Sequence, residues 1–225
     1  MPVTEFDLLR RYKRIGIYGG SFDPIHKGHL AIGHALIPQF DLDLFVFIPA
    51  FHAPHKRRKT PTPALDRYAM VCLATNDDPG LFVSKMEINL PERPYSIQTL
   101  ARLKTELPDS EIFFVIGADS WMEITTWRQW EEVLKLTNHI VVTRPGVTIA
   151  FDHVIDDIRE RIVDTRVVEE MPQDNRPEKI YITDAVNIDI SATLIREKIR
   201  ESIDSWKDEV PKEVANYIEK YQIYS

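Results

Sequence analysis

The sequence predicts an α/β fold in which helices cover a mostly parallel sheet. Short apolar runs alternate along the chain with longer segments whose apolar residues recur at helical spacing. Strands that are buried on both faces are apolar throughout, and such strands are typical of parallel sheets. The runs that predict strands are 15–18, 44–49, 81–84 (continuing toward 88), 111–119, 139–146 and 179–183.

Helices are expected between these strands. Residues 147–178 are the least regular stretch, with a helix expected at 155–163 and the start of a strand at 167–168. In the helix after the second strand, Asp66 and Arg67 are expected to face solvent, and the last helix is expected to cover the sheet. The segments that predict helices are 30–37, 64–75, 96–107, 191–199 and 211–221, with a short amphipathic one within 4–14.

Length and composition favour a single globular unit. A chain of 225 residues with 44% hydrophobic residues is long and apolar enough for a buried core. We expect residues 1–14 to form an extension and residues 15–225 the main domain. The net charge of −7 argues against general binding to nucleic acids, which favours a basic face. One cysteine, and no apolar run near about 18 residues, predict a cytoplasmic protein without a membrane partner. The sequence does not decide the oligomeric state, and a homo-oligomer is one possibility.

The chain is organised around the segment that follows its first apolar run. Gly19-Gly20 ends that run, and Asp23-Pro24 predicts the start of a helix with the aspartate as its cap. A strand, a glycine turn and a helix together aim backbone N–H groups and a positive dipole end at an anion. His26 and His29 lie on one face of such a helix, and Gly28 leaves room beside them. This pattern predicts a polyphosphate site.

Two simpler interpretations of the histidine pair stay open. The side chains can serve only to cap the helix, or they can belong to a zinc site. Zinc needs further ligands, whereas Cys72 is the only cysteine and no C-x-x-C is present. The strand and the glycine turn that precede the histidines favour phosphate.

The stretch Gly-Gly-Ser-Phe-Asp-Pro-Ile-His-Lys-Gly-His, residues 19–29, resembles the H-x-G-H signature of the nucleotidyltransferases, kin of the class I aminoacyl-tRNA synthetases. The resemblance implies a Rossmann-like, doubly wound, mostly parallel sheet in a single domain with C-terminal helices. It implies that His26 and His29 act in catalysis. It also implies that the turn binds ATP through Gly19, Gly20, Ser21, Phe22 and Gly28.

The segment from Ile190 to Arg196 is similar to a second signature of this superfamily, I-S-S-T-x-I-R. Ser191 is the predicted N-cap of the helix that begins there. The resemblance implies that Ser191 and Thr193 bind phosphate through their hydroxyls and that Arg196 binds it through its guanidinium. Arg196 is also a catalytic candidate. Ala192 stands where a second serine is usual, which removes one hydroxyl.

Two further segments resemble the nicotinate-nucleotide adenylyltransferases in particular. Pro-His-Lys at 54–56 matches a loop that lies over the active site in that family. This implies anion contacts from His55 and Lys56, with Lys56 also a catalytic candidate. Tyr95–Leu100 matches a Tyr-Thr/Ser-x-x-Thr-Leu segment, which implies that Thr99 hydrogen-bonds the pyridine base or its carboxylate. A purely helical role for Thr99 is the alternative.

Three more motifs resemble the same family. Gly117 and Asp119 end an apolar run, where ligands of open α/β sheets bind. The resemblance implies that both lie beside the adenosine, and helix capping is the alternative for Asp119. A W-x-x-W match at 127–130 implies that Trp127 stacks on the pyridine ring, with core or surface packing as the alternative. Arg144, in an R-P-G segment, is a candidate contact to the nucleotide, with a salt bridge as the alternative.

Together these motifs imply that the chain joins ATP to nicotinate mononucleotide, giving deamido-NAD and pyrophosphate in NAD biosynthesis. The mononucleotide phosphate attacks the α-phosphorus directly, without a covalent intermediate. No carboxylate pair predicts a protein metal site, so Mg²⁺ is expected on the ATP phosphates. Nicotinamide mononucleotide or pantetheine phosphate is an alternative acceptor, although pantetheine phosphate enzymes carry T-x-G-H. A non-catalytic nucleotide-binding regulator and an aminoacyl-tRNA synthetase fragment also stay open.

Overall fold

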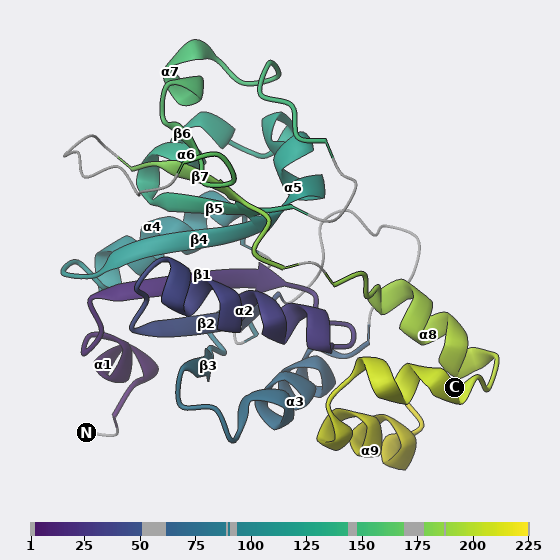
Figure 1. Cartoon of the computed structure of the whole chain (residues 1–225). Helices are drawn as coiled ribbons and strands as arrows, with labels where there is room; N and C mark the ends of the chain where they lie inside the picture. The colour runs from purple at the N-terminus through teal and green to yellow at the C-terminus, as the bar shows by residue number, and fades with distance from the viewer. Residues whose placement is uncertain are drawn as a thin grey trace.

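The computed structural model describes residues 3–50, 62–88, 90, 94–143, 148–168, 178–186 and 188–224. Its strands form one sheet in the order β3-β2-β1-β4-β5-β7-β6, and every described pairing is parallel (Figure 1). The predicted Rossmann-like α/β fold is confirmed. The strands are β1 (Arg14–Gly20), β2 (Leu44–Pro49), β3 (Leu81–Val83), β4 (Glu111–Gly117), β5 (Asn138–Val142), β6 (Ile162–Asp164) and β7 (Ile180–Thr183).

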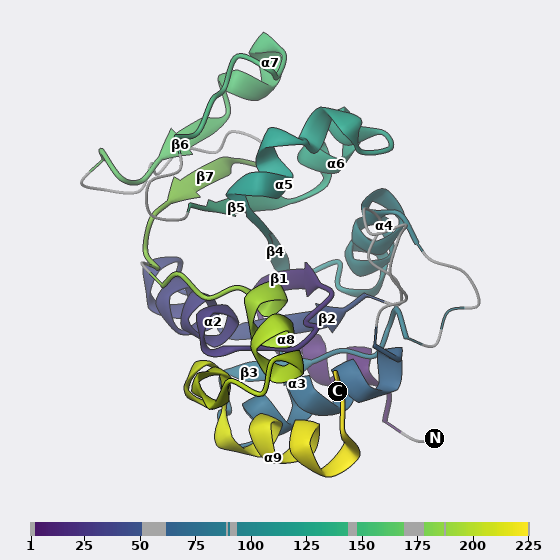
Figure 2. The same ribbon diagram turned by 90° about the vertical axis from the view of Figure 1, so that its right-hand side faces the viewer.

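Helices cover both faces of this sheet. Figure 2 shows α4 and α6 on one side of the central strands and α2 on the other. The α-helices are α1 (Glu5–Leu9), α2 (Lys27–Gln39), α3 (Ala64–Thr75), α4 (Ser96–Glu106), α5 (Ala118–Met122), α6 (Trp130–Leu136), α7 (Asp156–Arg159), α8 (Ala192–Arg200) and α9 (Lys212–Tyr221). Two short 3₁₀ helices are η1 (Ile124–Thr126) and η2 (Asp204–Glu209).

The central strands are apolar throughout because each of their faces packs in a separate hydrophobic core. In β4, Ile112, Phe114 and Ile116 belong to a core formed with α1, α4, α5 and α6. The alternate residues, Phe113 and Val115, belong to a second core formed with α2, α3, α8 and α9. Side chains alternate between the two faces of a strand, so a strand covered on both sides has no polar face.

Three details differ from the sequence-based expectations. Strand β3 ends at Val83 and is followed by a turn, so it does not run on toward Ile88. The helix expected at 155–163 is only the short α7, and its second half forms β6, which pairs with β7. No strand begins at 167–168, both of which the structure describes. A short apolar run does not show whether a segment forms a helix or an edge strand. Residues 162–164 form a strand because they pair with β7.

The outward face of α3 also differs from the expectation. Leu65 is 71% exposed, whereas Arg67, expected to face solvent, is 1% exposed. The buried stripe of this helix instead runs through Arg67, Met70, Val71 and Thr75. Helix α3 therefore turns Arg67, and not Leu65, toward the interior.

The last helix also differs from the expectation. Helix α9 packs against α3 rather than covering the sheet itself.

The segment before β1 is packed against the same body. Phe6 and Leu9 of α1 are buried in the first core. The carboxylate of Glu5 accepts hydrogen bonds from the Ser84 hydroxyl at 2.6 Å and from the Lys85 N–H at 3.2 Å. Among the described residues, no helix is both long and apolar enough to cross a membrane.

Candidate active site

The order of the strands defines where a ligand binds. Strand β1 lies between β2 and β4, so the chain winds in opposite directions on its two sides. In open α/β sheets such a switch point leaves a crevice beyond the carboxyl ends of the two strands. Tyr18 pairs with Val115, and the strands end two residues further on, at Gly20 and Gly117. Two glycines therefore border the crevice.

The turn after β1 differs from the expected one at its helix start. Helix α2 begins at Lys27 with His26 as its N-cap, so Asp23-Pro24 lies in the turn before the helix. The Asp23 carboxylate does not cap this helix; it accepts a hydrogen bond from the Tyr224 hydroxyl at 2.7 Å. Phe22, in the same turn, has a left-handed φ of 44°. The Asp23 carboxylate thus makes a long-range hydrogen bond with Tyr224 instead of the local helix cap that an aspartate at this position predicts.

His26 and His29 form a stacked pair at the N-terminus of α2. Their ring centroids are 3.6 Å apart with an interplanar angle of 23°. The backbone N–H of His26 donates to Nδ1 of His29 at 3.3 Å. Because an accepting nitrogen carries no proton, the neutral His29 ring has its proton on Nε2 and donates from there. The pair combines this donor with the positive end of a 13-residue helix.

Phe22 fixes the position of His29 from the other side. Its ring is 2% exposed, packs in the second core and meets the His29 ring edge-on at 5.1 Å. The ring is therefore occupied in packing, and a contact of Phe22 with a ligand would come from its backbone. Ser21, the next residue back in the turn, is half-buried.

Three glycines around the turn have different surroundings. A Cβ atom at Gly20 would lie 2.8 Å from the buried ring of Phe22, and one at Gly28 would lie 3.1 Å from Nδ1 of His26. A Cβ at Gly117 would meet no described atom within 4 Å. Gly20 and Gly28 therefore permit the close packing of Phe22 and His26, whereas Gly117 has no described atom near its Cβ position. Gly19 precedes Gly20 at the end of β1.

We expect Gly20→Ala to lower the free energy of unfolding by about 1–3 kcal/mol, the usual cost of forcing an extra carbon into a packed site. Gly117→Ala should change it by less than about 0.5 kcal/mol, because the new methyl group meets no atom of the described residues. Urea denaturation of the two variants checks this. Equal stability of both variants would show that the Phe22 ring moves aside freely.

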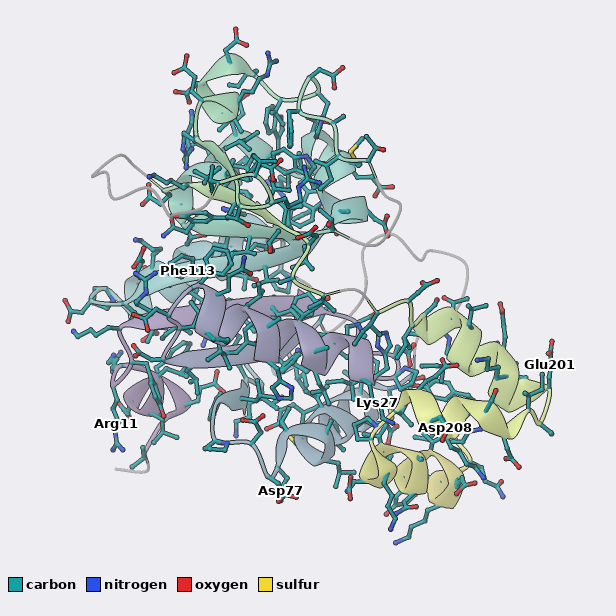
Figure 3. The ribbon with its side chains drawn as sticks, viewed as in Figure 1. Arg11, Lys27, Asp77, Phe113, Glu201 and Asp208 are labelled. Carbon is teal, nitrogen blue, oxygen red and sulfur yellow. The ribbon has the colours of Figure 1, made fainter. Side chains whose placement is uncertain are left out.

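Helix α8 brings a guanidinium to the same turn. A nitrogen of the Arg196 guanidinium donates to the carbonyl oxygen of Asp23, and Nη2 donates to the Thr193 hydroxyl at 3.2 Å. The start of α8 lies beside the start of α2 in both ribbon views (Figures 1 and 2). Lys27, exposed at the first position of α2, also lies on this side of the molecule (Figure 3). The two signature segments therefore meet in space.

Ser191 occupies the predicted N-cap position of α8. Its backbone is extended, but its hydroxyl makes no capping hydrogen bond to this helix, all of whose residues are described. Thr193 is exposed in the first turn. The Ser191 hydroxyl is therefore not used to cap this helix, although its residue type and position suit a cap.

The buried guanidinium of Arg67 was missed by the sequence analysis. It donates to the carbonyl oxygens of Thr62 at 3.0 Å, Ser21 at 2.6 Å and Ala50 at 2.6 Å. It therefore joins the turn after β1 to the end of β2 and the start of α3. Burial lowers the pKa of Arg67, and the nearby Asp23 opposes that change. Its spacing in the sequence could have predicted this burial, because Arg67 lies on the same face of the helix as Met70 and Val71.

The remaining predicted site residues do not join this group through the described contacts. Thr99 is 6% exposed on α4, and its hydroxyl donates to the Glu87 carboxylate at 2.7 Å. While that bond persists, the hydroxyl has no second proton to donate. Trp127 follows η1 and is packed against the first core. Asp119 is exposed in the first turn of α5, whose N-cap is Gly117.

Three predicted site residues lie outside the described residues: His55, Lys56 and Arg144. Among the described residues, no group of three or more His, Cys, Asp or Glu side chains is arranged to hold a metal ion. Apart from the single carboxylate of Asp23, the groups gathered at the turn are imidazoles and a guanidinium. Such groups bind phosphate oxygens, whereas Mg²⁺ prefers oxygen ligands.

Comparison with known proteins gives consistent matches over most of the chain. The cytidylyltransferase-like family matches residues 17–198. A relative from Corynebacterium glutamicum, described as a probable nicotinate-nucleotide adenylyltransferase, is 38% identical over 216 residues, covering 96% of this chain and 90% of its own length. One from Desulfatibacillum aliphaticivorans with the same description is 37% identical, covering 94% and 99%.

The fold is also found among solved structures. The Plasmodium falciparum nicotinic acid mononucleotide adenylyltransferase complexed with NaAD superposes with a TM-score of 0.70. The match covers 94% of this chain and 97% of the other, at 20% sequence identity. At that identity the likeness establishes the shared fold alone.

Proposed function

The chain belongs to the nicotinate-nucleotide adenylyltransferases of the cytidylyltransferase-like family, and we propose that its substrates are ATP and nicotinate mononucleotide. As a member of this family it is a nucleotidyltransferase. A phosphate oxygen of the mononucleotide attacks the α-phosphorus of ATP in line. The bond from that phosphorus to the oxygen bridging the α- and β-phosphates breaks, and pyrophosphate leaves. The products are deamido-NAD and pyrophosphate.

No protein base is needed for this step, because the attacking phosphate is already ionised at neutral pH. The enzyme has to align the two phosphates and to stabilise the charge that grows on the leaving pyrophosphate. The observation that carries the proposal is the stacked pair of His26 and His29 at the start of α2, with Arg196 bonded to the same turn. We assign to these three residues the charge-stabilising role, with Lys56 as a fourth member.

ATP is assigned to the crevice between the ends of β1 and β4. Backbone groups of the turn and the start of α8 contact the triphosphate, while Gly117 and Asp119 lie beside the adenosine. The lack of any described atom near the Cβ position of Gly117 supports this assignment. The contacts assigned to ATP are Gly19, Gly20, Ser21, Phe22, Gly28, Gly117, Asp119, Ser191, Thr193 and Arg196.

The mononucleotide is assigned to the first-core side of the sheet, with Trp127 stacked on the pyridine ring and Thr99 beside its carboxylate. His55 and Arg144 are assigned as further contacts. Thr99 would exchange its hydrogen bond to Glu87 for one to the substrate. Mg²⁺ is proposed to be bound by the ATP phosphates, since the side chains at the turn suit phosphate oxygens better than a hard cation. Its charge would further neutralise the triphosphate.

The test is a pyrophosphate-release assay of the purified chain with ATP, Mg²⁺ and one mononucleotide at a time. We expect release with nicotinate mononucleotide and a kcat/KM at least about tenfold lower with nicotinamide mononucleotide, a difference of about 1.4 kcal/mol. Pantetheine phosphate serves as the acceptor without a pyridine ring. Equal kcat/KM for the two pyridine mononucleotides would refute the nicotinate assignment, and no release with any acceptor would refute catalysis.

A further inference from the structure

The segment after α9 returns to the active-site turn. The backbone of Gln222 adopts a left-handed conformation at the end of α9, with a φ of 51°. The chain then turns back toward α3 and α8, as Figure 2 shows. There the Tyr224 hydroxyl donates to Oδ1 of Asp23 at 2.7 Å, across 201 residues of sequence. A residue outside both signature segments therefore contacts the turn within the first of them.

Asp23 is held by its backbone and by its side chain. Its carbonyl oxygen accepts from Arg196, and its carboxylate, on a residue only 9% exposed, accepts from Tyr224. The positive charge of Arg67 also interacts favourably with Asp23. Burial raises the pKa of Tyr224 far above its usual value, and the Asp23 carboxylate raises it further. The phenol therefore stays protonated and remains a donor at neutral pH.

We infer that Tyr224 is a positioning residue for ATP: by holding the Asp23 carboxylate, it leaves the Arg196 guanidinium available to the triphosphate. This inference rests on the proposed function. If the Tyr224 hydroxyl is removed, the Asp23 carboxylate can affect the nearby polyphosphate site in two ways. It can repel the phosphates, or it can draw Arg196 into an ion pair, and both weaken ATP binding.

The experiment compares Tyr224→Phe with Tyr221→Phe in the full chain. Each substitution removes one hydroxyl, but Tyr221 lies on α9 with 57% of its surface exposed, and its ring packs at a tilt against that of Tyr217. We expect Tyr224→Phe to raise the KM for ATP about tenfold, as the loss of a hydrogen bond to a charged group predicts. The KM for nicotinate mononucleotide should stay unchanged, and Tyr221→Phe should match the wild type in both.

The split between the two KM values separates positioning from stability. If Tyr224→Phe only lowered the folded fraction, the apparent kcat would fall and both KM values would be unchanged, which would overturn the inference. An equal rise in both KM values would overturn it as well. A wild type that releases no pyrophosphate refutes the proposed function instead, so the two failures are distinguishable.

A double-mutant cycle tests the contact itself. Asp23→Asn removes the charge that Tyr224 holds, so the Tyr224→Phe change should have little further effect on the KM for ATP in that background. We expect the double variant to lie within about twofold of Asp23→Asn, because residues in direct contact are not additive. A full tenfold effect of Tyr224→Phe on top of Asp23→Asn would show that the hydroxyl acts elsewhere.

Discussion

We expect His29→Ala to lower kcat by about 10²–10³-fold, the usual loss for one donor to a developing negative charge. His29 is the third residue of α2, and its Nδ1 accepts from the His26 N–H, so its Nε2–H is the donor. Leaving-group charge grows on the pyrophosphate only as the bond breaks. The loss should therefore fall mainly on kcat rather than on the KM for ATP, as steady-state kinetics with ATP and nicotinate mononucleotide will measure.

Two variants sharpen this result. His29→Gln carries an amide N–H near the position of the imidazole Nε2 and should recover part of the lost rate. His34→Ala is the matched control on the same helix, because His34 is exposed and pairs with Asp78 away from the turn. It should leave kcat unchanged. A normal kcat for His29→Ala would remove His29 from the mechanism.

The second large effect is expected on stability, from Arg67→Met. The methionine fills much of the same volume but leaves the carbonyl oxygens of Thr62, Ser21 and Ala50 without their guanidinium donors. An unsatisfied buried acceptor costs about 1 kcal/mol or more, so the free energy of unfolding should fall by at least about 3 kcal/mol. That is a large share of the roughly 5–15 kcal/mol typical of a domain. Urea denaturation without nucleotide measures it.

The controls separate charge from geometry. Arg67→Lys keeps the positive charge but cannot donate in the fixed fork that reaches three carbonyls, so it should recover only part of the loss. Arg11→Met makes the same replacement at an exposed position beyond α1 and should change stability by less than about 0.5 kcal/mol (Figure 3). If Arg67→Met proved as stable as Arg11→Met, the three carbonyls would not depend on the guanidinium.

Sequence patterns were most informative where the cause of the structure is local. The runs at 44–49 and 111–119 contain β2 and β4, because nearly continuous apolar residues suit a strand covered on both faces. Ser191 marked the start of α8 correctly. The helix face of α3 was assigned wrongly, because a charged residue such as Arg67 is placed in solvent by any rule that considers residue type alone.

By itself, the sequence determined the α/β fold, the glycine turn with its histidine pair and the helix start after Ser191, since each depends on residues within a few positions of one another. Only the tertiary structure decided that the Asp23 carboxylate accepts a hydrogen bond from Tyr224 instead of capping a helix, and that Arg67 is buried under the turn. The Arg196 and Tyr224 contacts to Asp23 span 173 and 201 residues. Such contacts depend on how the sheet brings distant segments together, which local propensity does not encode.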